Sequence, residues 1–172
     1  MQIQVETVYS RPVLTAMARA LRKTLRRKKA LRTRALGGVL ILVAVCTIAI
    51  SYTYDHSPLA VGSMAVLALT LLGVMIWEDT LNGLLARRQM LAGTETVQTT
   101  FSEDSYCTVT QAARSEWQYS QIQHICQSTD YLILLLDSNH AQVCDKTRFS
   151  AGTPEQLLSL LVQKTGREIT SI

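Results

Sequence analysis

The chain has 172 residues, of which 48% are hydrophobic and 17% are charged, and its formal net charge is +4 at pH 7. This length leaves room for one modest soluble domain beside two long apolar runs, which excludes a protein of several large domains. The charge is unevenly divided: residues 1–34 carry ten basic residues against one acidic (+9), residues 35–91 two against three (−1), and residues 92–172 five against nine (−4).

Residues 2–9 alternate polar and apolar side chains and are rich in β-branched types, which predicts a half-buried strand. A single strand is not stable alone, so we expect it to join a sheet. The other β-rich region begins after residue 92. The two ends of the chain are therefore predicted to meet.

Residues 10–34 form the rest of the N-terminal segment and are predicted to be a basic amphipathic helix. Ser10 is placed as its N-cap and Pro12 in its first turn. Its apolar residues recur at helical spacing as one stripe: Leu14, Met17, Leu21 and Leu25. We expect this helix to run on into the first apolar run, with a flexible point at Gly37 and Gly38.

Eight basic residues lie just before the first apolar run: Arg22, Lys23, Arg26, Arg27, Lys28, Lys29, Arg32 and Arg34. Nucleic-acid binding is the least supported role for this cluster, because it adjoins an apolar run and has no recognition motif. A role in membrane topology and contact with anionic lipid headgroups is favoured, at about 1 kcal/mol for each Lys or Arg near the surface. Anionic membrane lipids are thus the predicted partner, and nucleic acid is not.

Residues 35–54 and 58–77 are two runs of 20 residues without Asp, Glu, Lys or Arg. Each run would span about 30 Å as a helix, the thickness of the hydrocarbon core of a bilayer. The connection of residues 55–57 is so short that the helices must be antiparallel, which predicts a transmembrane hairpin. Basic residues flank only the open end of the hairpin, so the positive-inside rule places both termini in the cytoplasm. A secretory signal peptide is the competing interpretation, and the second run disfavours it.

Aromatic residues mark both ends of the hairpin, with Tyr52 and Tyr54 at the outer interface and Trp77 at the inner one. Apart from the interfacial tyrosines, Cys46 is the single ionisable group within the spans, which disfavours an ion pore or pump for the monomer. Six small residues would allow close helix approach and leave homo-oligomerisation open: Gly37, Gly38, Ala44, Gly62, Ala65 and Gly73.

Residues 78–93 are predicted to continue the second transmembrane helix into the cytoplasm, with Gly93 as its end. The apolar face of this extension consists of Leu81, Leu84 and Leu85. This face is expected to lie beside the basic helix, in the antiparallel sense that the hairpin imposes. Glu78 and Asp79 would then face some of its arginines, and an exposed ion pair of this kind stabilises by at most about 1 kcal/mol.

Residues 94–172 are predicted to be an α+β domain. Six β-rich segments precede its helix: residues 95–101, 106–110, 115–119, 122–127, 131–136 and 141–144. Residues 131–136 are apolar without alternation, as in a central strand. Thr153, Pro154 and Gln156 form a capping box that begins the closing helix, and Gly166 ends it. The order indicates a bent antiparallel sheet with the helix covering its open end.

Several groups of residues carry a resemblance to a known family: Phe101-Ser102-Glu103-Asp104, Trp117 with Ile122 and Ile125, residues 131–136, Lys146 with Phe149, and Thr153-Pro154-Glu155. With the two apolar runs, the chain resembles the YcxB-like proteins, which are small bacterial membrane proteins. The resemblance implies two transmembrane helices, a C-terminal domain similar to bacterial pleckstrin-homology (PH) folds, and the bacterial cytoplasmic membrane. It implies no common activity. The chain departs from the family pattern at Asp145, where proline is frequent, and this puts a role for that turn in doubt.

The motif positions are interpreted as packing positions, and the predicted domain core is Phe101, Trp117, Ile122, Ile125, Leu134, Phe149, Leu157 and Leu161. Lys146 and Arg148 are a candidate small anion site near the membrane. The charge of −4 on residues 92–172 disfavours phosphoinositide binding.

Neither a metal site nor catalysis is expected. A zinc site would need Cys107, Cys126 and Cys144 with His124 or His140, but their spacing matches no recognised pattern. Buried, reduced cysteines are the favoured interpretation. The histidines are too scattered to indicate a nucleophile with its base, so we expect no enzyme activity and no cofactor.

Three functions are compatible with these features. The favoured one is a membrane-anchored interaction protein that binds another protein through its cytoplasmic sheet, for example by β-augmentation of a free edge strand. The alternative is a self-protection protein against a membrane-active bacteriocin or toxin. An oligomeric pore is third.

Overall fold

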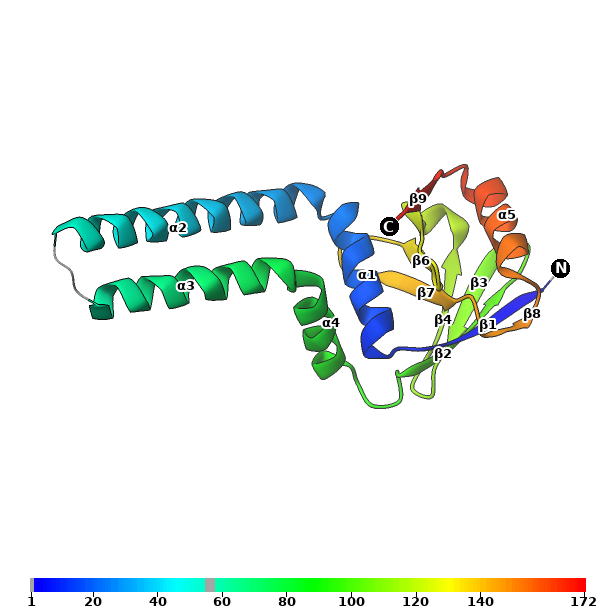
Figure 1. The fold of residues 1–172 in the computed structure, drawn as a ribbon. Helices are drawn as coiled ribbons and strands as arrows, with labels where there is room; N and C mark the ends of the chain where they lie inside the picture. Colours follow the sequence, from blue (N-terminus) through cyan, green and yellow to red (C-terminus); the bar gives the residue numbers. More distant parts are fainter. Residues whose placement is uncertain (1, 55–57) are drawn as a thin grey trace.

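The computed structural model describes residues 2–54 and 58–172. Figure 1 shows a long helical hairpin on one side, a two-sheet domain on the other, and two shorter helices between them. The helices are α1 (Arg11–Lys23), α2 (Arg27–Tyr54), α3 (Pro58–Ile76), α4 (Glu78–Gln89) and α5 (Pro154–Thr165), with a 3₁₀ turn at Tyr119–Gln121. The predicted turn at residues 55–57 lies outside the described residues. The chain is thus mixed α+β, and its two long apolar helices precede all of its strands except β1 in the sequence.

Nine strands are described: β1 (Ile3–Val8), β2 (Thr96–Phe101), β3 (Ser105–Val109), β4 (Arg114–Gln118), β5 (His124–Gln127), β6 (Tyr131–Leu135), β7 (Ala141–Asp145), β8 (Phe149–Ala151) and β9 (Ile169–Ser171). They form a five-stranded sheet in the order β4-β3-β2-β1-β8 and a four-stranded sheet in the order β7-β6-β5-β9. The six segments expected between residues 95 and 144 correspond to β2–β7. β8 and β9 were not expected.

The N-terminal strand joins the sheet of the C-terminal domain, as predicted. β1 lies antiparallel to β2 over its whole length, from Ile3 opposite Phe101 to Val8 opposite Thr96, and its other edge pairs with β8. The expectation of a wholly antiparallel sheet is wrong at one place. After α5 the chain returns as β9, which runs parallel to β5.

The main hydrophobic core lies between the two sheets and α5. Alternation along β1 directs Ile3 and Val5 inward, where they meet side chains of both sheets and of α5. All eight residues proposed for the domain core lie here: six are buried, and Trp117 and Phe149 are partly buried against them. α5 is fixed by its predicted capping box, since Thr153 Oγ1 accepts from Gln156 N–H (3.3 Å) and Gln156 Oε1 accepts from Thr153 N–H (3.0 Å). Gly166, in the left-handed region at φ 62°, ends the helix.

A second core covers the opposite face of the four-stranded sheet. Val13 and Leu21 of α1 are buried there against Ile133 and Leu135 of β6 and Val143 of β7. β6 is therefore covered on both faces, which explains why residues 131–136 are apolar without alternation. The stripe on α1 is thus an integral part of the sheet domain.

The expected continuous helix from residue 12 into the hairpin is wrong. α1 ends at Lys23, and α2 begins at Arg27. Between them Thr24 Oγ1 and N–H both donate to Ala20 O (2.6 and 3.1 Å), and Arg26 N–H donates to Leu21 O, five residues back (2.8 Å). The second core fixes α1 against the sheet, so the chain must turn here to form the hairpin. The expected flexible point at Gly37 and Gly38 lies within the unbroken α2.

A second turn separates α3 from α4. α3 ends at Ile76, and Trp77 has φ −95° and ψ 17°, outside the helical range. Leu81 N–H still donates to Trp77 O (2.9 Å), so Trp77 begins α4 as its N-cap. In Figure 1, α4 turns sharply away from α3 and runs beside α1 across the open end of the hairpin. The predicted single helix from residue 58 to 91 is therefore two helices.

Candidate functional site

The junction between the hairpin and the sheet domain is made by α1 and α4, which pack closely against each other. Gly83 is buried at their crossing, where a Cβ atom would stand 2.7 Å from Thr15 Oγ1 and 2.8 Å from Thr15 N. The predicted pairing of the extension with the basic helix is confirmed. Its predicted face is wrong, because Leu81 and Leu85 remain 39% and 52% exposed while Gly83 makes the contact. An isolated glycine in a helical pattern is the sequence signal for such an approach.

Ion pairs join α4 to α1 and α2 at this crossing. Arg22 Nε and Nη2 donate to Asp79 Oδ1 and Oδ2 at 2.6 and 2.7 Å, and Arg19 Nε lies 3.6 Å from Asp79 Oδ2. Arg34 Nε, in α2, donates to Glu78 Oε2 at 3.1 Å. The expectation that both acidic residues face arginines is thus confirmed.

The electrostatics of the Arg22–Asp79 pair favour the charged forms. Burial alone would raise the pKa of the Asp79 carboxyl, but the hydrogen bonds and charge of Arg22, with the charges of Arg19 and Arg34, hold that pKa below its usual value. The hydrogen bond to Asp79 raises the pKa of the Arg22 guanidinium. Both groups are therefore ionised at neutral pH.

The eight basic residues proposed for the membrane surface divide into two groups. Arg22, Arg26 and Arg34 bind other parts of the chain, and Arg26 donates from Nε to Ser138 O (2.7 Å) and from Nη2 to Asn139 Oδ1 (3.1 Å). Among residues 2–54 and 58–172, the other five have no protein ion pair or side-chain hydrogen bond and are exposed: Lys23, Arg27, Lys28, Lys29 and Arg32. These five are the cations available to a ligand or a surface.

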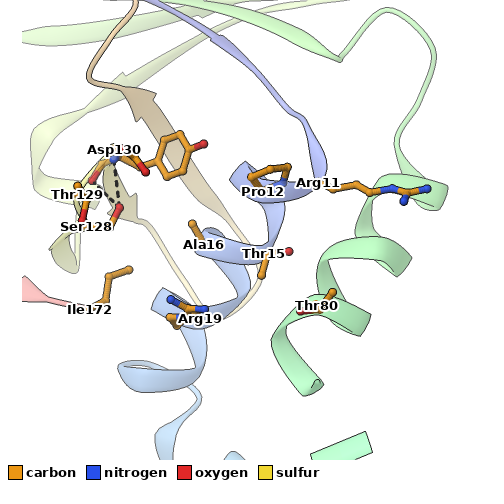
Figure 2. A pocket seen from close by; sticks show the side chains of 11 residues that line it. Arg11, Pro12, Thr15, Ala16, Arg19, Thr80, Ser128, Thr129, Asp130 and Ile172 are labelled. Atoms are coloured by element: carbon orange, nitrogen blue, oxygen red, sulfur yellow. Dashed lines mark hydrogen bonds between the residues drawn. The ribbon is translucent and has the colours of Figure 1, made fainter. Parts of the chain in front are cut away.

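Two crevices flank α1. The first, about 490 Å³, lies between α1, the β5–β6 turn and Ile172 (Figure 2). Arg11, Arg19 and Asp130 are among its lining residues, and Ser128 Oγ accepts from Tyr131 N–H at its wall (3.1 Å). The crevice is lined by positively charged arginines and a negatively charged carboxylate. Its charge is therefore mixed and favours neither an anionic nor a cationic ligand.

The second crevice, about 520 Å³, lies between α1, the first turns of α2, and α4. Leu14, Met17, Leu21 and Leu85 form its apolar wall. Its polar lining residues are Arg22, Arg26, Lys29, Thr33, Glu78, Asn82, Gln89 and Asn139. Three of the charged groups in this list bind other protein groups, which leaves Lys29 as the cation in this wall without a described partner.

The expected small anion site at Lys146 and Arg148 does not fit the contacts of these residues. Lys146 Nζ donates to the carbonyl oxygens of Ser128 (2.6 Å) and Thr129 (3.2 Å). Arg148 lies 3.7 Å from a carboxylate oxygen of Glu6 and 3.8 Å from one of Asp145. Both cations therefore serve structural contacts.

Asp145 organises the turn between β7 and β8. Its Oδ1 accepts from Thr147 N–H (2.9 Å) and from Thr147 Oγ1 (2.7 Å), which makes an Asx turn. Its own N–H donates to Thr7 Oγ1 of β1 (3.2 Å). A proline at this position would lack that donor.

The cysteines and histidines are dispersed. Cys126 and Cys144 are buried, which raises the pKa of their thiols to about 11 and about 12. His140 Nδ1 lies 2.7 Å from Asp137 Oδ2 in an exposed turn. Within the described ranges 2–54 and 58–172, no group of three His, Cys, Asp or Glu side chains could hold a metal ion.

The aromatic residues expected at the two interfaces lie on the surface of the hairpin. Tyr54 is 86% exposed at the end of α2, and Tyr52, two residues before it, is 69% exposed. Trp77 is 61% exposed at the α3–α4 turn, where its ring covers Gly73.

The five-stranded sheet ends in an open edge. β4 is its terminal strand, and within the described residues β4 pairs with β3 alone. Thr110 N–H donates to Ala113 O (2.8 Å) in the β3–β4 turn, and this sets the alternation of the ladder. The main-chain groups of Arg114 and Glu116 consequently point away from β3. This edge offers free donors and acceptors to an extended peptide.

Comparison of the chain with protein-family models, with curated proteins and with solved structures finds no match in any of the three.

Proposed function

We propose that this protein is a membrane-anchored interaction module, with a transmembrane hairpin and a sheet domain that binds another protein. α2 and α3 are long and apolar enough to cross a membrane, with mean hydropathies of 2.3 and 2.4 in their most apolar windows. The protein itself buries 6% and 0% of these windows. So large an apolar surface is unfavourable in water, and a lipid bilayer would bury it along the whole length of both helices.

The orientation follows from charge. Exposed cations concentrate at the α1–α2 turn, at the open end of the hairpin, where Arg27, Lys28 and Arg32 lie. The positive-inside rule then places both ends of the chain and the sheet domain in the bacterial cytoplasm, with anionic headgroups against these cations. Because α1 and α4 pair firmly, the domain sits at a fixed position beneath the membrane.

We infer a PH-like domain from the order of its elements. Two sheets of five and four strands enclose one core, and α5 closes it, which supports the PH-like fold implied by the resemblance to YcxB-like proteins. β1 precedes the hairpin in the sequence and still joins this domain, which follows the hairpin. The family assignment is supported by layout and by the core positions of the motif residues.

The observation that carries the binding function is the open edge of β4. Its outward groups at Arg114 and Glu116 face away from the sheet, and charged side chains there oppose nonspecific pairing. A partner strand that added to β4 would extend the five-stranded sheet. The polar clusters described above serve turns and ion pairs, so a binding role is proposed in place of a catalytic one.

Two experiments test the anchor. The full chain should stay in the membrane pellet after alkaline carbonate extraction. Tags on the two ends should both resist protease in intact spheroplasts and both become sensitive after permeabilisation. Release into the supernatant, or tags of opposite sensitivity, would refute the transmembrane hairpin.

A third experiment tests the edge. A photoreactive amino acid at Arg114 in the full chain should give a discrete crosslinked protein in cells. Glu116→Pro in that background should reduce the adduct about tenfold, because proline removes one outward N–H and blocks strand addition. Glu116→Ala, which also removes the hydrogen bond from Ser105 Oγ (2.7 Å), is the matched control and should retain the adduct. Equal adducts from both variants would refute β-augmentation at β4.

A further inference from the structure

The two faces of α4 are chemically different. Gly83 lies against α1, and the opposite face carries Trp77, Leu81 and Leu85, which follow one another at intervals of four residues. Leu85 lies where this face meets the rim of the second crevice. Their exposed fractions are 61%, 39% and 52%, although the helix packs tightly on its other side. Arg88, three residues after Leu85, is exposed on the same outward face.

The position of α4 decides which way this face points. α1 contacts both α4 and the strands β6 and β7, so α4 is the outer layer of the junction. In Figure 1, α4 lies on the hairpin side of α1, directly beside the end of α3. The face opposite α1 is therefore turned toward the side from which the hairpin projects.

We propose that α4 lies flat in the boundary between lipid headgroups and acyl chains, with Trp77, Leu81 and Leu85 buried in lipid. This inference rests on the proposed transmembrane hairpin, since a bilayer around α2 and α3 would end at the level of α4. An in-plane helix of this kind buries its apolar face about 5–10 Å into the boundary. The guanidinium of Arg88 at the edge of the face would reach the lipid phosphates.

The exposed cations favour lipid over a second protein as the cover. Arg27, Lys28 and Arg32 lie at the base of α2, and Arg88 lies in the last turn of α4, so positive charge flanks the apolar face. An anionic membrane surface matches this charge, whereas a second copy would oppose like charges. The face is also continuous along the chain with α3, in whose apolar window no residue is buried by the protein.

The consequence is a two-part attachment. The hairpin would hold the protein in the bilayer, and α4 would fix its tilt and rotation. Because α1 links α4 to β6 and β7 through the second core, the orientation of the sheet domain relative to the membrane would be set by α4.

The test places tryptophan on two sides of α4 in the full chain, reconstituted into vesicles of phosphatidylcholine and phosphatidylglycerol. Trp77→Phe is the parent, because Trp77 would lie at the interface through the hairpin alone, and Trp117 supplies a constant background. Leu85→Trp and Leu81→Trp report the outward face. Arg87→Trp is the control, because residue 87 lies about 200° around the helix from residue 85 and is exposed.

Phosphatidylcholine brominated near the headgroup end of its acyl chains is the quencher. The emission added by Leu85→Trp or Leu81→Trp should fall by about twofold or more, and that added by Arg87→Trp should stay within a few per cent. Equal quenching at 85 and 87, or unquenched emission at both 81 and 85 in protein that resists carbonate extraction, would overturn the in-plane placement alone. Protein that leaves the vesicles in carbonate would overturn the proposed hairpin itself.

Discussion

Arg22 and Asp79 form a two-point ion pair across 57 positions of sequence, with N–O distances of 2.6 and 2.7 Å. Their side chains are only 19% and 13% exposed, so the pair is screened by solvent less than a surface pair is. Asp79→Ala should lower the free energy of unfolding by about 1–2 kcal/mol, measured by chemical denaturation of the full chain in detergent. Glu78→Ala, which removes the single bond to the more exposed Arg34, should cost less than about 1 kcal/mol.

The same pair should make the free energy of unfolding of the protein depend on pH in the acidic range. The pKa of Asp79 is lower in the folded protein than in the unfolded chain, so its contribution is complete above the unfolded value of about 4. The contribution is lost as the pH falls through the folded value. The stability difference between the native chain and Asp79→Asn should therefore be constant near neutral pH and shrink below about pH 4. A constant difference down to pH 2 would contradict this assignment.

The crossing of α1 and α4 should not accept a side chain at Gly83. A Cβ atom there would approach Thr15 Oγ1 and the Thr15 backbone to within 3 Å, so Gly83→Ala must push the helices apart. We expect a loss of about 1–3 kcal/mol in the free energy of unfolding. Gly38→Ala in α2 is the control, because nothing lies within 4 Å of its Cβ position, and its better helix propensity should make it neutral or slightly stabilising. Equal effects of the two substitutions would refute the close approach.

The sequence predicted those elements whose signals are local or periodic. The capping box at Thr153 and Gln156, the strand at residues 2–9 and the apolar run 131–136 each have a pattern that one element determines by itself. The break at Thr24 has no such pattern, because it arises from competition between the second core, which holds α1, and the hairpin, which requires α2 to turn away. β9 has only three residues, which are all exposed, and its pairing depends on the direction in which α5 delivers the chain.

The candidate site, like the fold, could be predicted from the sequence only where its contacts follow from local patterns. The facing of Glu78 and Asp79 toward arginines follows from antiparallel helices, whereas the division of the eight basic residues into bound and free groups depends on loops far away in the sequence. Arg26, for example, is tied to Ser138 and Asn139, more than 100 residues later.

The cysteines should differ sharply in reactivity toward a membrane-impermeant maleimide at pH 7. Burial raises the pKa of Cys126 to about 11, so roughly one thiol in ten thousand is ionised, and Cys144 is fully buried as well. Cys107 is partly exposed on β3 and should be labelled in vesicles, while Cys46 in α2 should be protected by lipid. Cys107→Ser should therefore abolish labelling of the folded protein. Residual labelling at Cys46 would contradict the membrane hairpin.

Two tyrosines of the main core should respond oppositely to loss of the hydroxyl group. Tyr106 is 1% exposed and stacks on Phe101 with ring centroids 5.3 Å apart, and within residues 2–54 and 58–172 its hydroxyl has no hydrogen-bond partner. Tyr119, 5.8 Å from Tyr106 between ring centroids, donates from its hydroxyl to Ser102 O at 2.6 Å. An unsatisfied buried hydroxyl costs about 1–3 kcal/mol, whereas a made hydrogen bond stabilises by about 1 kcal/mol.

Tyr106→Phe should consequently raise the free energy of unfolding by about 1 kcal/mol, and Tyr119→Phe should lower it by a similar amount. Both substitutions keep the ring and its packing, so each serves as the control for the other. The measurement is chemical denaturation of the full chain in detergent, followed by circular dichroism. If Tyr106→Phe destabilised the protein as much as Tyr119→Phe, the hydroxyl of Tyr106 would have a partner in the folded core, and its assignment as unsatisfied would be wrong.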